Sequence, residues 1–292
     1  MILFHADDYG INRKQAQRIL TCRSRGALNS VSLLVTGPEA LECAALLPED
    51  VRCRLHLNFR EGPCLSDPSH IKLLVDDKGY FRLSFGELLF WSVFRRKDMK
   101  EQLKRETHKQ IRRLQELMGE NISLRIDSHG HYHMIPVVWD ALFECCRERQ
   151  LEILELRIPA EPFGPIMKDT YLLLKAPVSG LIKNLIMHIL YACNRIFGKQ
   201  PEGFDFKNKV PVFFGMIFTT RMTAVPVKRL LPSFIKIAAA GGRELELMFH
   251  PGGLSEEDVM WDERFRDFHR SPYRIREAKA LCSLSDEQFF NM

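Results

Sequence analysis

Six of the ten histidines fall in four short segments, and each segment closes an apolar run that predicts a β-strand. The segments are His5–Gly10 (HADDYG), His56–Asn58 (HLN), Asp127–His133 (DSHGHYH) and His250–Gly253 (HPGG). Imidazole and carboxylate groups together can bind a divalent cation. A further carboxylate can then accept a proton from water, and a further histidine can protonate a leaving group. These residue types therefore predict metal-assisted hydrolysis.

Each segment alone has a plainer explanation. An Asp-Asp pair commonly caps a turn, and His-Pro-Gly is a turn signal. A single histidine such as His56 is commonly a satisfied core or surface residue, and the HGHYH run could be a metal-binding surface tract. The occurrence of such residues at four separate strand ends is what favours a catalytic site.

Short apolar runs alternate with helical patterns along the chain, as in a parallel sheet with right-handed crossovers. We expect strands at residues 2–6, 30–35, 53–57, 124–127, 153–158, 212–218 and 244–249, and a hairpin at 74–81. We expect helices at 12–25, 38–47, 95–113, 136–149, 172–197 and 227–239. This predicts the α/β class and a distorted TIM-like (β/α) barrel of about seven parallel strands, with an open doubly wound sheet as the alternative. With 292 residues and no break in composition, we expect one domain over 1–292.

The net charge of +5 is concentrated in the predicted helix at 95–113, which is either a solvated face or a surface that attracts anionic glycans or lipid headgroups. No nucleic-acid motif accompanies it. Charged residues, Pro and Gly interrupt the apolar stretches at 87–94 and 172–197, so we expect no transmembrane span. Core or dimer-interface helices are the favoured interpretation, with a homo-oligomer in the latter case and peripheral membrane contact as the alternative.

Eight cysteines are scattered without Cys-x-x-Cys pairs, and Asp7 and Asp8 interrupt the apolar start of the chain. These features predict reduced thiols in a cytoplasmic protein.

The four segments resemble those of the YdjC/ChbG family of carbohydrate deacetylases. That family typically carries Asn-Ala-Asp-Asp-Phe-Gly near the N-terminus, an early His-Leu or His-Phe, Asp-Ser-His-x-His-x-His, and a late Glu-Leu-Met-x-His-Pro-Gly. This chain has HADDYG, His56-Leu57, DSHGHYH and ELMFHPG at the matching places. The stretch 157–161 and the segment 273–281 are also similar to parts of the family.

The resemblance implies a TIM-like barrel and one divalent metal, Mg²⁺ or Zn²⁺, with Asp8, His56 and His129 as its ligands. It implies Asp7 as the base that activates water and His250 as the acid for the leaving amine. The implied substrate is an N-acetylated carbohydrate of the N-acetylglucosamine type, from which an acetyl group is removed. We expect further residues to contact the substrate or support the first set: His5, Tyr9, Asn58, Asp127, His131, His133, Arg157 and Glu246.

Two features depart from the family pattern: His5 replaces the usual Asn, and residues 170–203 match no family motif. Strand alternation places Glu246 on the same face as His250, which suggests that Glu246 orients or charges that imidazole. Two other functions stay open. One is a phosphoesterase in which His5, His131 and His133 complete a second metal site. The other is a non-catalytic glycan- or metal-binding protein.

Overall fold

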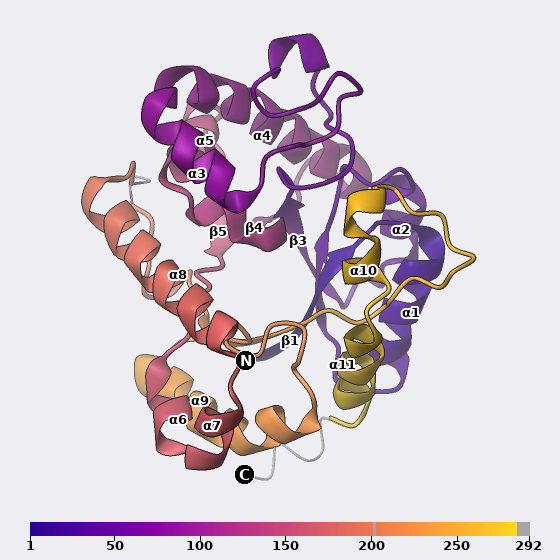
Figure 1. Cartoon of the computed structure of the whole chain (residues 1–292), viewed down its shortest axis with the longest axis vertical. Coiled ribbons are helices and arrows are strands. Elements are labelled where there is room, and N and C mark those ends of the chain that lie inside the picture. The colour runs from indigo at the N-terminus through magenta and orange to yellow at the C-terminus, as the bar shows by residue number, and fades with distance from the viewer. Residues whose placement is uncertain (201–202, 285–292) are drawn as a thin grey trace.

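The computed structural model describes residues 1–200 and 203–284, and its centre is a single parallel sheet of seven strands (Figure 1). The strand order is β5-β4-β3-β2-β1-β7-β6, and every pairing is parallel. The strands are β1 (Ile2–Tyr9), β2 (Ser30–Leu33), β3 (Arg52–Leu57), β4 (Leu124–Ser128), β5 (Ile153–Leu156), β6 (Val212–Phe214) and β7 (Leu245–Phe249). The predicted α/β class and barrel-like sheet of seven parallel strands are confirmed.

Eleven α-helices and three short 3₁₀ helices connect and cover the described strands. Between β1 and β4 lie α1 (Arg13–Ser24), α2 (Ala40–Leu46), η1 (Pro68–His70), α3 (Phe85–Phe94) and α4 (Arg96–Met118). Between β4 and β6 lie η2 (His129–Met134), α5 (Pro136–Glu148), α6 (Phe163–Lys168), α7 (Thr170–Lys175) and α8 (Val178–Phe197). The last elements are α9 (Ala224–Gly241), η3 (Glu263–Phe265), α10 (Arg266–His269) and α11 (Pro272–Cys282). Within the described residues, no helix is long and apolar enough to cross a bilayer.

The sheet is curled, and its two edge strands approach each other. β5 and β6 are the edges, and the backbone N–H of Leu156 donates to the carbonyl of Lys209, just before β6. Alternate strand positions therefore face a narrow interior, while the remaining positions pack against the surrounding helices. Charged and polar side chains fill the interior: His5, Asp7, Ser30, Ser32, Arg54, His56, Asp127, Arg157 and Glu246.

Local signals explain where the helices begin and end. Asn12 caps α1 by accepting from the Gln15 N–H, and Ser84 and Glu87 form a reciprocal capping box at the start of α3. The basic helix α4 ends at Gly119, whose φ of 103° suits glycine. These caps keep the ends of helices that flank the strand-end loops in place.

Several expected elements differ in detail. Residues 74–81 form a turn with two isolated bridges, Val75↔Phe81 and Pro63↔Tyr80, so the predicted hairpin has no strands of its own. The helix expected at 172–197 is two helices, α7 and α8, because Pro177 lacks the N–H that would continue the first. The apolar residues of α3 and α8 are largely exposed, so the core alternative is wrong for these segments, while the dimer-interface and membrane-contact alternatives stay predictions.

Candidate active site

A β-bulge in β1 brings two adjacent aspartates to the same site. The β1–β2 register runs from His5↔Ser30 and Ala6↔Val31 to Tyr9↔Leu33, so Asp7 and Asp8 together oppose one residue of β2. In a regular strand, neighbouring side chains point to opposite faces, whereas a bulge re-aims one of them. Asp8 adopts a φ of 64°, an uncommon conformation for a residue other than glycine. The strained backbone therefore lets both carboxylates face the interior.

The three predicted metal ligands converge. Oδ1 of Asp8 lies 2.8 Å from Nδ1 of His129 and 3.4 Å from Nε2 of His56, and all three side chains are buried. Two ligand atoms at about 2.1 Å from one ion, separated by about 90–110°, lie about 3.0–3.4 Å apart. Asp8 Oδ1 and His56 Nε2 also have no hydrogen-bond partner among the described residues. A divalent cation bound between these atoms would match their separations. It would also give the two buried atoms a partner, and leaving them without one costs free energy.

The opposite side of each ligand is bound to a second residue. Nδ1 of His56 lies 2.6 Å from Oδ1 of Asp127, and Arg274 donates to Oδ2 of Asp8 over 2.6 Å. Nε2 of His129 contacts a carboxylate oxygen of Glu61. Burial alone would raise the pKa of Asp8, but the positive charges of His129 and Arg274 hold it well below its usual value. Outer partners of this kind orient metal ligands and select the histidine tautomer.

Asp7 is held by a fully buried guanidinium. Arg157 donates to Asp7 through two nitrogens, over 2.8 Å and 2.7 Å, which fixes the plane of the carboxylate. Burial would raise the pKa of Asp7, but Arg157 and the neighbouring His5 outweigh it and hold the pKa well below its usual value. Asp7 is therefore an ionised acceptor at neutral pH. Nε2 of His250 lies 3.9 Å from its Oδ2, so the predicted base and acid are adjacent.

The carboxylate beside His250 is Glu277 of α11, and the expectation for Glu246 is wrong. Oε2 of Glu277 accepts from the backbone N–H of His250 and lies 3.7 Å from its Nδ1. Glu246 instead accepts from Arg157 over 2.7 Å and pairs with Arg54 at 2.6 Å. Alternation correctly places Glu246 on the interior face, but the interior arginines lie closer to it than the imidazole does.

Three further predicted residues, His5, His131 and His133, surround these groups. The two ring nitrogens of His5 contact the hydroxyls of Ser30 and Ser32, at 2.7 Å and 2.6 Å. Those of His133 contact Ser128 Oγ and, at 2.8 Å, the carbonyl of Arg157. His131 adopts a φ of 62°, and its Nδ1 has no hydrogen-bond partner among the described residues. Burial and then the charge of Arg157 hold the pKa of His131 well below its usual value, so it is neutral.

The other two predicted residues, Asn58 and Tyr9, form no hydrogen bond with the predicted metal ligands. Asn58 organises the loop after β3, donating to Thr36 Oγ1 and to the carbonyl of Glu61. Tyr9 points away from the interior, and its hydroxyl donates to the carbonyl of Cys43 in α2. The bulge explains this orientation, since Tyr9 follows the two residues that face inward.

Sequence reasoning missed Glu61, His269, Arg274 and Glu277. The carboxylate of Glu61 contacts both His129 and, at 3.0 Å, Nε2 of His269. No motif marks Glu61, and only its complete burial identifies it. Arg274 and Glu277 lie in the segment 273–281, which resembles the closing helix of the family. The resemblance of this segment was recognised from the sequence, but no function was predicted for its residues.

Glu161 forms a separate buried group near these loops. One of its carboxylate oxygens accepts from the backbone N–H groups of Gly215, Met216 and Ile217, and thereby holds the turn after β6. Burial nevertheless raises the pKa of Glu161 from 4.5 to about 7.

This pKa predicts a pH-dependent stability. Because the folded-state pKa of Glu161 lies above its unfolded value, its favourable contribution is complete below pH 4.5 and is lost as the pH rises through about 7. Glu161→Gln keeps an acceptor for the three N–H groups without the buried charge. Relative to wild type, the variant should gain about 3 kcal/mol of unfolding free energy between pH 4.5 and pH 8. Urea titrations of both proteins at the two pH values measure this gain, and an unchanged difference would refute it.

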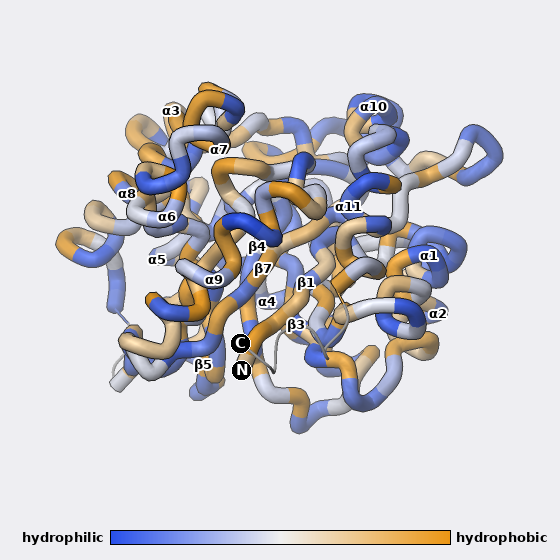
Figure 2. Tube along the Cα trace, turned by 90° about the horizontal axis from the view of Figure 1, so that it is seen from below, coloured by the Kyte–Doolittle hydropathy of each residue, from blue (hydrophilic) through white to orange (hydrophobic). Residues whose placement is uncertain are grey.

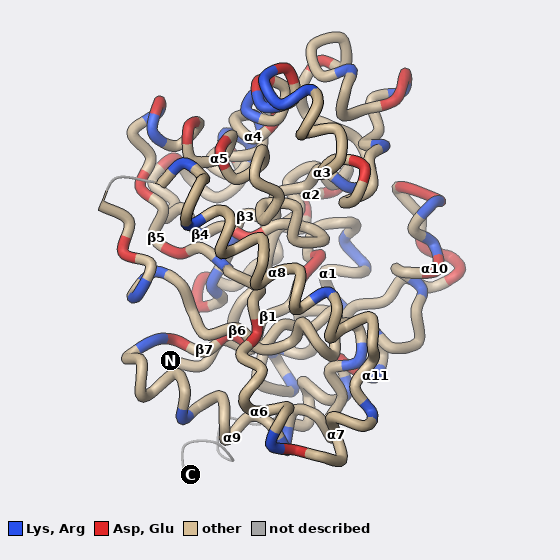
Figure 3. Tube along the Cα trace, turned by 60° about the vertical axis from the view of Figure 1, so that its left-hand side comes forward, with Lys and Arg blue, Asp and Glu red and all other residues tan. Residues whose placement is uncertain are grey.

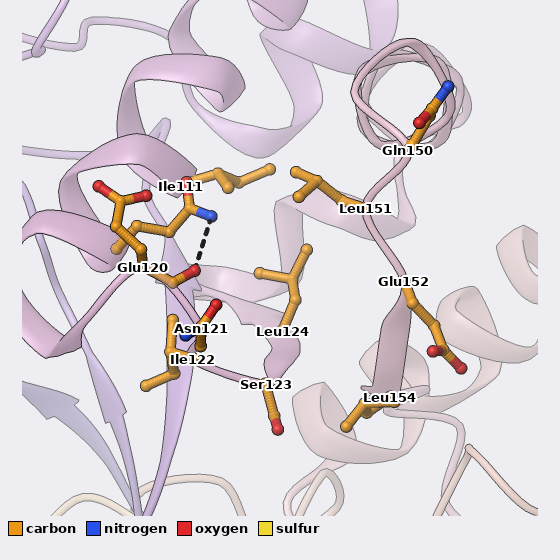
Figure 4. Close-up of a pocket in the computed structure, with 11 residues that line it drawn as sticks. Ile111, Glu120, Asn121, Ile122, Ser123, Leu124, Gln150, Leu151, Glu152 and Leu154 are labelled. Carbon is orange, nitrogen blue, oxygen red and sulfur yellow. Dashed lines mark hydrogen bonds between the residues drawn. The ribbon is translucent and has the colours of Figure 1, made fainter.

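A pocket at the other end of the sheet is unrelated to these residues. Figure 4 shows it between the end of α4 and the segments that lead into β4 and β5. Its lining includes Gln115, Glu120 and Gln150 but no residue of the Asp–His group. It lies at the amino ends of the strands, whereas the catalytic residues of such barrels gather at the carboxyl ends.

The fold and the site define an α/β half-barrel whose Asp and His residues gather at the carboxyl ends of its strands. The chain belongs to the YdjC-like protein family, whose model matches residues 1–291. It is 30% identical over 155 residues to a carbohydrate deacetylase of Thermoanaerobacter pseudethanolicus, covering 52% of this chain and 59% of that protein. It is 28% identical over 165 residues to a chitooligosaccharide deacetylase of Proteus mirabilis, covering 55% and 61%. The matches thus span little more than half of these relatives.

The fold is also similar to a solved structure from Enterococcus faecalis, described as a candidate cellobiose-phosphate cleavage protein. The TM-score is 0.62 at 21% identity, and the match covers 98% of this chain and 91% of the other. At this identity, the likeness supports the architecture alone. The family resemblance inferred from the motifs is confirmed.

Proposed function

We propose that this protein is a metal-dependent carbohydrate deacetylase that hydrolyses the N-acetyl group of an N-acetylglucosamine-type sugar or oligosaccharide, with one Mg²⁺ or Zn²⁺. The observation that carries the proposal is the buried convergence of Asp8, His56 and His129, in which Asp8 Oδ1 and His56 Nε2 accept or donate no hydrogen bond among the described residues, directly beside Asp7 and His250. The names of the matched relatives supply the substrate class.

Each residue has a distinct part in the proposed reaction. Asp8, His56 and His129 would hold the cation, which makes a water molecule more acidic and polarises an acyl oxygen when bound. Asp7, ionised and fixed by Arg157, accepts the proton of the attacking water. His250 delivers a proton to the departing amine nitrogen as the carbon–nitrogen bond breaks. The products are acetate and the free amino sugar.

The interior offers little support for a two-metal phosphoesterase. His5, Asp7 and Asp127 do form a second Asp–His group. However, Arg157 already binds both of these carboxylates, and both nitrogens of His5 contact serine hydroxyls. The guanidinium of Arg157 neutralises the carboxylate charges that would otherwise attract a second cation.

Metal removal tests the proposal. Protein stripped with a chelator should release no acetate from N-acetylated chito-oligosaccharides, and Mg²⁺ or Zn²⁺ should restore release. His56→Ala should lose both bound metal and activity, because it removes a ligand. His70→Ala, at an exposed histidine of η1, serves as the matched control and should keep both. Acetate is measured enzymatically and metal by mass spectrometry. Full activity of the stripped protein would disprove metal dependence.

We also propose a single catalytic domain over 1–292 in a reducing, cytoplasmic environment. All eight cysteines lie within the described residues, and each is a free thiol. Free, largely buried thiols are typical of proteins that do not rely on disulfides.

A further inference from the structure

The helix α8 exposes most of its large apolar side chains. Its solvent side carries Val178, Ile182, Leu185, Ile189, Ile196 and Phe197, and the last of these is 81% exposed. Its inner side buries Met187 and Leu190 together with two asparagines, Asn184 and Asn194, which are completely buried. A helix that serves only to cover a core places its apolar stripe inward. The exposed apolar stripe of α8 is therefore wider than covering the core requires.

The buried side of α8 is fixed against the loops of the candidate site. The side chain of Asn184 accepts from the backbone N–H of Glu161 over 2.8 Å and donates to its carbonyl over 2.9 Å. Asn194 donates to the carbonyl of Met134 at the end of η2, the segment that begins with His129. The two asparagines of the inner face thus bind backbone groups of the site loops and fix which side of α8 meets solvent.

Two other helices extend the same surface. On α3, the side chains of Phe90, Trp91, Val93 and Phe94 are exposed, and on α7 Leu174 is 83% exposed. Figures 1 and 3 both show α8 between α3 on one side and α6 and α7 on the other. Figure 2 shows hydrophobic residues of α3 and α8 at the outer edge of the molecule. Together the exposed apolar residues of α3, α7 and α8 form one surface, which we call the apolar face.

The charges around the apolar face are all of one sign along α7 and α8. Residues 170–200 contain no Asp or Glu, but they include Lys175, Lys183, Arg195 and Lys199. Figure 3, with this side forward, shows basic but no acidic residues on α8. None of the four forms an ion pair with a described residue, and the same holds for Arg95 and Lys97 at the end of α3.

We infer that the apolar face docks on a lipid bilayer containing anionic lipids, with α3, α7 and α8 in the interfacial plane. Apolar helical faces bordered by Lys and Arg insert at the boundary between headgroups and acyl chains, and anionic headgroups strengthen the attachment. A second copy of this chain that met the first along α8 would place basic residues against basic residues, because residues 170–200 contain no Asp or Glu. The inference goes beyond the proposed function and does not require it, since docking can be measured without substrate.

Vesicle co-sedimentation of the full chain tests the inference. Vesicles of phosphatidylcholine alone are compared with vesicles that also contain phosphatidylglycerol, at low and high salt. We expect strong binding to the anionic vesicles that weakens with salt. The triple variant Ile182→Ser/Ile189→Ser/Phe197→Ser should lower the partition coefficient on the order of tenfold or more, because each side chain contributes buried apolar area.

A matched triple variant controls for general changes of the surface. Leu41→Ser/Val259→Ser/Ile275→Ser removes three equally exposed apolar residues outside the apolar face and should bind like wild type. Equal losses in the two triple variants, or no binding of wild type to anionic vesicles, would overturn the inference. The inference would be overturned in favour of a second copy by a different result. In that case, the wild-type protein would be a dimer in ultracentrifugation and would not bind vesicles, and the first triple variant would be a monomer.

Discussion

Asp7→Asn should lower the rate of acetate release by a factor of about 10²–10⁴, the usual contribution of a general base. The amide has nearly the shape of the carboxylate but cannot accept the proton of water. Bound metal should stay at the wild-type level, because Asp8, His56 and His129 keep their outer partners Arg274, Asp127 and Glu61. Acetate release and metal content are measured on the same samples.

The control for this variant is the same substitution at another buried aspartate that accepts from an arginine. Asp140 in α5 accepts from the half-exposed Arg96 over 2.6 Å and from the backbone N–H of Lys199 over 2.7 Å, and neither partner is a site residue. Asp140→Asn should affect stability without affecting turnover. If Asp7→Asn lost its metal together with its activity, Asp7 would be a ligand, and if it kept full activity, it would not be the base.

Arg157→Met should be the most destabilising single substitution in the interior. The guanidinium contacts Asp7, Asp127 and Glu246, and all four side chains are buried. Removing one partner of a buried ionic group leaves the others uncompensated, which costs about 3–5 kcal/mol. We therefore expect a loss of this size in the unfolding free energy at neutral pH, measured by urea titration.

On mild acidification, the unfolding free energy of Arg157→Met should change in the opposite direction to that of wild type. In wild type, Arg157 keeps the pKa values of Asp7 and Asp127 below their usual range. Their contribution to stability is therefore present above the unfolded-state pKa and is lost as the pH falls through the folded-state pKa. In the variant, burial would raise these pKa values, so moderate acidification should recover part of the lost stability.

Two further variants keep the experiment informative. Arg157→Lys retains a positive charge without the two-pronged geometry, and it should fold even if Arg157→Met does not. Arg52→Met removes a partly exposed guanidinium from its pairs with Glu155 and Glu244, and solvent screening should make its cost clearly smaller. Equal losses for Arg52→Met and Arg157→Met would contradict the special role of the interior arginine.

The apolar periodicity of the sequence was sufficient to predict the seven parallel strands and most of the helices between them, although α6 was missed and α7 and α8 were predicted as one helix. Strand positions alternate between two environments whatever the tertiary structure is, so this pattern is local. The motif residues could also be assigned to one end of the sheet, because the carboxyl ends of parallel strands lie together. His5, Asp7, His56 and Asp127 accordingly face one interior.

Only the tertiary structure decided which neighbour each of these residues has. Regular alternation would have sent Asp8 to the opposite face, and the β1 bulge with its left-handed backbone reverses this. Alternation placed Glu246 correctly on the interior face but could not show that Arg157 and Arg54 bind it. Glu61 and Glu277 come from a loop and from the last helix, and no local pattern links them to His129 and His250.

The same limit applies to α8. From its sequence, this apolar stretch was expected in the core or at a dimer interface, with peripheral membrane contact as the alternative. Burial depends on what the other elements offer, and here the site loops present the backbone groups of Glu161 and Met134, which asparagine side chains satisfy and apolar ones cannot. The sequence by itself thus determined the strands, the helices and the set of chemical groups. Their partners, and the face of α8 that meets solvent, depend on contacts between residues distant in the chain.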